Sequence, residues 1–72
     1  MKSTRNKILG NNIKAERYRK ELSQFDLAEK VDVSVSSIGL IERGLQTPSA
    51  FLLFDIARVL GIDINELFKG IA

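Results

Sequence analysis

The sequence predicts an all-α fold, a compact bundle of five helices, and three observations support that prediction. Apolar residues recur at helical spacing along most of the 72 residues. Residue types that favour helix starts and helix ends stand at the borders of the apolar segments, and the loops between these segments are short. A chain of this length is near the lower limit for an independent core, so it is expected to form one domain.

The first two helices are expected over residues 6–20 and from Ser23 to about Val31. Ser23 and Asp26 form a Ser-x-x-Asp pattern, in which the serine caps the start of the helix. Asp32 follows in a tight turn. This turn is expected to need a positive φ, which Asp tolerates better than most residues but less well than glycine.

The third helix is expected to begin after Ser34 and to end at Gly44, because glycine commonly terminates helices. Together with the second helix it is expected to form a helix-turn-helix. The apolar residues of each helix share one face, and a small residue, Ala28, lies where the two helices cross. These positions are Leu27, Ala28, Val31, Val33, Ile38 and Ile41. The second helix of such a motif has the right size to enter the DNA major groove.

A fourth helix is expected over about residues 50–60, ending at Gly61. Asp63 and Glu66 are expected to form another capping box, which opens a short fifth helix through Phe68. Three capping patterns with short loops between them favour a compact all-α bundle.

The composition excludes several classes of function. The chain has no cysteine and no histidine, which excludes disulfides and zinc–thiolate sites and removes the commonest general base. Ser34 and Ser36 have no histidine to activate them, so we expect that the protein is not an enzyme. We also expect that it binds no cofactor, metal or small-molecule ligand. The longest apolar run, residues 50–54, is too short to span a membrane and no signal peptide is visible, so a cytoplasmic location is expected.

Charge is distributed unevenly along the chain. Residues 1–20 hold seven basic residues and one acidic residue, a net charge of +6, whereas residues 21–72 hold four basic and eight acidic residues, a net charge of −4. A basic segment of this kind suits attraction to phosphates. Residues 1–7 are expected to form a flexible arm that follows a DNA groove through Lys2, Arg5 and Lys7. The alternative is a solubilising tail.

Several pieces of the sequence, in order and without gaps from about Leu9 to Phe68, resemble the Cro/repressor-type (XRE-type) helix-turn-helix family of bacterial and phage transcription regulators. The pieces are Ile13 with Arg17, Ser23-Gln24, Leu27-Ala28, Ile38 with Ile41-Glu42-Arg43-Gly44, Pro48-Ser49, Ala57 with Leu60-Gly61-Ile62, and Glu66-Leu67. The resemblance implies a lambda-repressor-like DNA-binding domain over residues 8–69, preceded by the basic arm and followed by a tail at residues 70–72. At Asp32 the family usually has glycine, so this turn departs from the pattern.

Geometry and the resemblance together indicate the DNA-contacting face of the third helix. Ile38 and Ile41 define its buried side, and the helical repeat places on the opposite side Ser36, Gly39, Leu40 and Arg43. The resemblance implies that the base-contacting residues are Val35, Ser36 and Leu40. Ser36 can exchange a hydrogen bond with a base, whereas Val35 and Leu40 can contact thymine methyl groups. The alternative is a helix that only packs, with its outer apolar residues covering a neighbour.

Phosphate contacts are expected on both sides of this helix. Gln24 lies in the first turn of the second helix, where the helix dipole favours an anion. The resemblance adds three residues at the end of the third helix and in the loop after it, namely Arg43, Gln46 and Thr47. Ordinary loop polarity is the alternative for Gln46 and Thr47. The resemblance also implies a structural ion pair between Arg17 and Glu42, which holds the third helix against the first.

Several apolar residues suggest a second copy of the chain. A protein this small cannot bury all of them alone, and exposed apolar patches usually have partners. The residues expected at a dimer interface are Phe51, Leu52, Leu67, Phe68 and Ile71. A symmetric dimer places two recognition helices about 34 Å apart, one turn of DNA, and so predicts a pseudo-palindromic operator.

The sequence therefore predicts a regulator that binds double-stranded DNA sequence-specifically, a dimeric repressor that inserts residues of about 34–44 into the major groove. The alternative is a protein-interaction module with the same fold. In that case the apolar face of the third helix, together with Phe25, contacts a protein partner.

Overall fold

The computed structural model describes residues 4–72 of the chain. Four α-helices and one 3₁₀ helix follow each other in the order α1 (Thr4–Arg19), α2 (Gln24–Lys30), α3 (Val35–Glu42), α4 (Ala50–Leu60) and η1 (Ile64–Phe68). This part of the chain contains no strand. The all-α prediction is confirmed, but the prediction of five α-helices is wrong, because the fifth element is a 3₁₀ helix.

The short length of η1 explains why it is not an α-helix. Asp63 caps it by accepting a hydrogen bond from the Asn65 N–H, 2.8 Å away, and the Glu66 N–H donates to the Asp63 carbonyl three residues back. The expected capping box does not form, and the Glu66 carboxylate pairs with the Lys69 ammonium at 2.6 Å. Five residues offer too few i→i−4 hydrogen bonds to favour the α-helical ladder over this tighter turn.

Serine caps start three of the helices. Ser23 and Asp26 form the predicted capping box, with the Asp26 N–H donating to Ser23 Oγ at 2.9 Å and the Ser23 N–H donating to Asp26 Oδ2 at 3.0 Å. The latter hydrogen bond lowers the pKa of Asp26 below its ordinary value. Ser34 caps α3, as predicted, and Ser49 caps α4 by accepting from the Leu52 N–H at 3.0 Å.

All four α-helices end in the same way. A residue one or two positions past the end of each helix has a positive φ, and these residues are Glu21 (57°), Asp32 (58°), Gly44 (77°) and Gly61 (67°). The N–H of the next residue then bonds a carbonyl five residues back, as Leu22 does with Arg17 and Val33 with Ala28. The positive φ predicted for Asp32 is confirmed. The same conformation at Glu21 was not anticipated.

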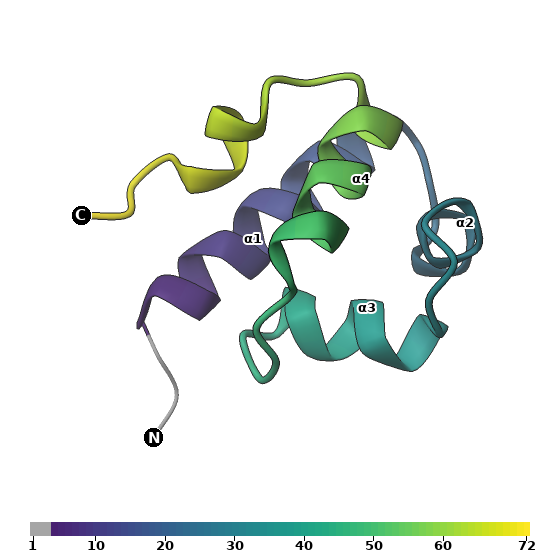
Figure 1. The fold of residues 1–72 in the computed structure, drawn as a ribbon, viewed down its shortest axis with the longest axis horizontal. Coiled ribbons are helices and arrows are strands. Elements are labelled where there is room, and N and C mark those ends of the chain that lie inside the picture. Colours follow the sequence, from purple (N-terminus) through teal and green to yellow (C-terminus); the bar gives the residue numbers. More distant parts are fainter. Residues whose placement is uncertain (1–3) are drawn as a thin grey trace.

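The helices enclose one apolar core. Figure 1 shows α4 crossing in front of α1, with α3 along the lower edge and α2 seen nearly end-on beside them. Residues from every element meet between them, and the largest fully buried side chains are Ile13, Leu27, Ile38, Ile41, Ile56, Leu60 and Leu67. Both α2 and α3 therefore rest on a shared core rather than only on each other.

The backbones of α1 and α3 come into direct contact. A Cβ on Gly10 would lie 2.3 Å from the Ile41 carbonyl oxygen and 2.6 Å from that of Glu42. At Gly44 a Cβ would lie 2.7 Å from Cγ of Lys7. Only glycine permits these approaches, so two glycines set the close packing of α1 against the C-terminal end of α3.

The helix α1 begins before the expected residue 6, and residues 4–7 of the expected arm are helical. The reason is that this end of α1 is anchored. Asn6 Nδ2 donates to Thr47 Oγ1 at 2.7 Å, and Lys7 packs on Gly44. Lys2 lies outside the described residues. No helix within residues 4–72 is long and apolar enough to cross a membrane.

Candidate nucleic-acid interface

The outer face of α3 is open to solvent, and its inner face is buried. Ile38 and Ile41 are almost completely buried against the core. On the other side Val35 is 43% exposed, Ser36 and Arg43 are exposed, and Leu40 is half-buried. The sidedness predicted for this helix is confirmed, so the three expected base-contacting residues share one accessible surface.

A shallow depression runs between this face and the start of α2. Six residues line it, namely Gln24, Val35, Ser36, Gly39, Leu40 and Arg43. We call it the α3 hollow. Its walls combine two aliphatic side chains with an amide, a hydroxyl and a guanidinium, so the surface offers both apolar contacts and hydrogen-bond donors. These are the two kinds of group that distinguish base pairs at the major-groove edge.

A buried ion pair fixes α3 behind this surface. Arg17 Nε lies 2.7 Å from Glu42 Oε2 and its Nη2 lies 2.9 Å from Oε1, while Nη1 donates to the Leu22 carbonyl at 2.9 Å. Hydrogen bonding to Glu42 holds the pKa of the Arg17 guanidinium above its ordinary value. The pair predicted from the resemblance is present in the structure, with Arg17 and Glu42 each 4% exposed.

Gln24 connects the hollow to this ion pair. Its Nε2 donates to Glu42 Oε1 at 3.0 Å, which commits one of the two N–H donors of the amide. The other donor is left for an incoming group, so the expected phosphate contact through Gln24 is compatible with the structure but is limited to a single donor. Sequence reasoning missed this internal hydrogen bond.

The remaining phosphate candidates gather at the C-terminal end of α3. Arg43 is exposed and its Nε donates to the Gly39 carbonyl at 3.3 Å. Gln46 and Thr47 are exposed in the following loop. The start of α1 lies beside them, because Lys7 packs on Gly44 and Arg5 lines a depression with Thr47. The structure therefore brings Arg5 and Lys7, expected in an arm, next to the loop instead.

The residues expected at a dimer interface do not behave alike. Leu67 is fully buried, so its assignment to the interface is wrong: it closes the core between α1 and η1, where Asn12 Nδ2 also donates to the Leu67 carbonyl at 2.9 Å. Leu52 and Ile71 are half-buried against the core. Phe51 and Phe68 are 85% and 39% exposed.

Three further exposed aromatic residues lie outside that expected set, namely Tyr18, Phe25 and Phe54. Phe54 follows Phe51 by one helical turn on α4 and is 51% exposed, with the Arg58 guanidinium 5.6 Å from its ring centre. Phe25 on α2 is 61% exposed, and nothing in the structure explains it. Together Phe51 and Phe54 form an aromatic stripe that could have been found from the i, i+3 spacing on α4.

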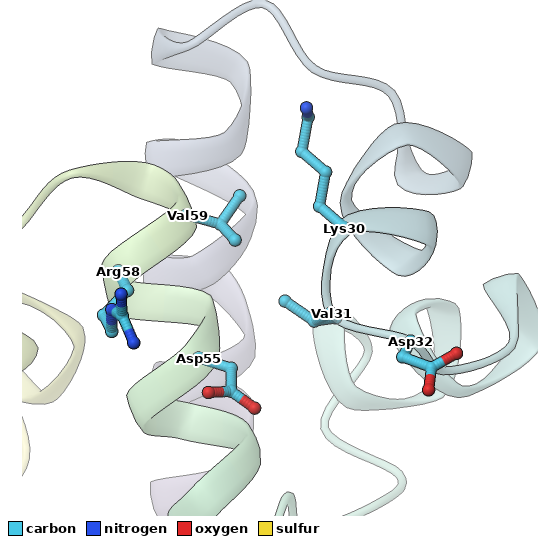
Figure 2. A pocket seen from close by; sticks show the side chains of 6 residues that line it. All are labelled: Lys30, Val31, Asp32, Asp55, Arg58 and Val59. Carbon is cyan, nitrogen blue, oxygen red and sulfur yellow. The ribbon is translucent and has the colours of Figure 1, made fainter.

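A separate concavity lies between the end of α2 and α4 (Figure 2). Lys30, Val31 and Asp32 project from one side and Asp55, Arg58 and Val59 from the other. It shares no residue with the α3 hollow, and two of its four charged residues are acidic. Within residues 4–72 no group of three or more His, Cys, Asp or Glu side chains could hold a metal ion. This concavity therefore lacks the positive character that suits phosphate.

Comparisons with known proteins agree with this geometry. A family model described as helix-turn-helix (HTH_3) matches residues 13–67. Over 60 residues the chain is 43% identical to YazB, an uncharacterized HTH-type transcriptional regulator of Bacillus subtilis (strain 168), and the match covers 83% of this chain and 87% of YazB.

Two solved structures extend the comparison. The restriction-modification controller protein C.AhdI of Aeromonas hydrophila is similar with a TM-score of 0.84 and 32% identity, over 88% of this chain and 96% of that one. The biofilm master regulator SinR, solved in complex with DNA, gives a TM-score of 0.79 and 37% identity over 85% and 98% of the two chains. The chain accordingly belongs to the HTH_3 (XRE-type) family of helix-turn-helix transcriptional regulators.

Proposed function

We propose that this protein regulates transcription by binding double-stranded DNA sequence-specifically through α3. The observation that carries the proposal is the two-sidedness of α3. Its inner face is buried and held by Glu42, whereas its outer face is open and lines a hollow. The similarity to SinR, whose structure was solved in complex with DNA, supports DNA binding by this chain.

Base contacts in this proposal come from Val35, Ser36 and Leu40. Val35 and Leu40 offer only apolar contacts, so they favour thymine, whose methyl group is exposed in the major groove. Ser36 supplies one hydrogen bond to a base edge. With so few donors on this face, half-site spacing and DNA shape contribute much of the specificity.

Phosphate contacts in this proposal flank α3. Arg43, Gln46 and Thr47 contact the backbone at one end of the helix, with Lys7 and Arg5 beside them, and Gln24 contacts it at the other. Lys2 adds a charge ahead of α1. Because each neutralised phosphate releases counterions, binding should weaken steeply as salt concentration rises.

The regulator acts as a dimer in this proposal, and as a repressor in the cytoplasm without catalytic activity. The exposed apolar residues that support a dimer are Phe51 and Phe68, and Leu52 and Ile71 are partly exposed as well. A two-fold dimer requires a pseudo-palindromic operator, with half-sites about one DNA turn apart.

The test is selection of bound sites from a random pool of duplex DNA at near-physiological salt. We expect an inverted repeat with thymines that face Val35 and Leu40. Leu40→Ala should weaken binding to the recovered operator about tenfold, since one lost base contact costs about 1–3 kcal/mol. Asn11→Ala, a change at an exposed position of α1, is the matched control and should bind as the wild type does.

Recovery of no motif would overturn sequence-specific binding. The alternative function, a protein-interaction module that uses the outer face of α3 and Phe25, would then be tested by salt-insensitive capture of a partner. The sequence similarity to transcriptional regulators supports DNA binding over this alternative.

A further inference from the structure

Gly39 is exceptional among the five glycines of the chain, all of which lie within residues 4–72. Gly10 has no space for a side chain, because a Cβ would lie 2.3 Å from a carbonyl oxygen. The three glycines that follow helices adopt a positive φ of 77°, 67° and 82°, namely Gly44, Gly61 and Gly70. Neither steric crowding nor a positive φ requires glycine at position 39. A Cβ added there would have Gln24 Oε1 as its nearest atom, at an ordinary contact distance of 3.8 Å.

The stability of α3 does not explain this glycine either. Gly39 is the fifth of eight residues in α3, and glycine in the middle of a helix is destabilising relative to alanine. Alanine fits the available space at this position, so folding alone would favour it. A glycine in such a place commonly allows a ligand to approach the backbone closely.

The surroundings of Gly39 indicate what approaches it. It lies one helical turn from Val35 and from Arg43, and it lines the α3 hollow together with Val35 and Leu40. Val35 and Leu40 are apolar, whereas the Gln24 amide, whose Oε1 is 3.8 Å from the Cβ position of residue 39, and the Arg43 guanidinium are polar. A lining that combines aliphatic side chains with an amide and a cation suits the edge of a base pair that carries a methyl group and lies next to a phosphate backbone.

We propose that Gly39 is a specificity-determining position, which leaves room in the α3 hollow for the 5-methyl group of a thymine in the major groove. This inference rests on the proposed DNA binding. It goes beyond it by assigning the discrimination to a missing side chain rather than to a contact. A methyl group added to the protein at residue 39 would compete for space with the methyl group of the base.

The experiment combines one protein change with one DNA change. Affinities are measured for the wild type and Gly39→Ala, each with the selected operator and with an operator in which the thymine facing the hollow is replaced by deoxyuridine. Deoxyuridine lacks only the 5-methyl group. We expect Gly39→Ala to lose about tenfold in affinity for the thymine operator and less than about threefold for the deoxyuridine operator.

Thermal unfolding checks that the variant is folded. Gly39→Ala should unfold at a temperature no lower than the wild type, because alanine is the better helix former. Asn11→Ala also raises helix propensity but lies on α1, so it controls for a general effect of stability on affinity. It should bind both operators as the wild type does.

Each outcome decides a separate point. Equal binding of Gly39→Ala and the wild type to the thymine operator would overturn the inference and leave the proposed function intact. Equal losses on both operators would also overturn it, because the added methyl would then clash with something other than the thymine methyl. Failure of the wild type to bind any duplex would overturn the proposed function itself.

Discussion

The guanidinium of Arg17 and the carboxylate of Glu42 face each other in two parallel hydrogen bonds, 2.7 and 2.9 Å long, and join α1 to α3. They are the only buried charged residues within the described chain. Every donor of Arg17 that faces the interior has an acceptor, and no buried side-chain nitrogen or oxygen atom within residues 4–72 lacks a hydrogen-bond partner. As long as both residues are present, the buried charges of the pair neutralise each other and their buried polar atoms are hydrogen-bonded.

Removing one member of this pair should be more damaging than replacing both. Arg17→Ala leaves the Glu42 carboxylate buried without its counter-charge, so we expect the free energy of unfolding to fall by about 3–5 kcal/mol. The double variant Arg17→Met with Glu42→Leu should recover most of that loss. Urea denaturation of the single and double variants measures both effects. An Arg17→Ala protein as stable as the wild type would show that the pair does not hold α3.

Glu21→Gly should stabilise the protein by about 0.5–1 kcal/mol. Glu21 has a φ of 57°, which costs an ordinary residue about 1–2 kcal/mol, and glycine relieves this at a smaller entropic cost. A gain of this size raises the midpoint of thermal unfolding by a few degrees in a domain of this length. The reciprocal change, Gly61→Ala at the equivalent position after α4, should lower the midpoint. If both variants shift it in the same direction, the shared helix ending is not the cause.

Asp26→Asn should make stability less dependent on acid pH. Asp26 has a lowered pKa in the folded protein, so the stabilisation that it gives is fully present above its ordinary pKa of 3.8 and is lost as the pH falls through the lower folded value. The wild type should therefore lose stability more steeply than Asp26→Asn below about pH 4. Urea midpoints over a pH series test this. Asp55→Asn, which removes a carboxylate without removing a cap, is the control.

Phe51→Lys should weaken self-association without unfolding the domain. The ring is 85% exposed, so its loss should change the free energy of unfolding by less than about 0.5 kcal/mol. Sedimentation equilibrium of the wild type and the variant measures the association. Asn11→Lys adds the same charge at another exposed position and should associate as the wild type does. If Phe51→Lys and Asn11→Lys associate equally strongly, Phe51 is not part of the interface.

Features that depend on neighbouring residues could be predicted from the sequence. The Ser23 and Asp26 capping box, the positive φ at Asp32 and the buried side of α3 all depend on contacts within a few residues. Local hydrogen bonding and helical periodicity are sufficient to specify them. The outer face of α3 followed from the same periodicity.

Features that depend on distant contacts could not be predicted. Asn6 contacts Thr47 across 41 residues, and Asn12 contacts the Leu67 carbonyl across 55 residues. No pattern in the sequence brings these residues together. The same limit explains why Leu67 was assigned to an interface: an apolar residue in a short terminal helix faces inward or outward according to how that helix docks, and docking depends on α1. The internal hydrogen bond of Gln24 is a further example.

The contact of Gly10 with the carbonyl oxygens of α3 has a mechanical consequence. Backbone atoms touch there without an intervening side chain, so no rotamer change can absorb a tilt of α3 relative to α1. In the proposed complex with DNA, α1 and α3 should then move as one rigid unit, and adjustment for a close fit should come from the double helix, through bending or a change in groove width. The protein would then discriminate between DNA sequences partly by their stiffness, including at base pairs that no side chain reaches.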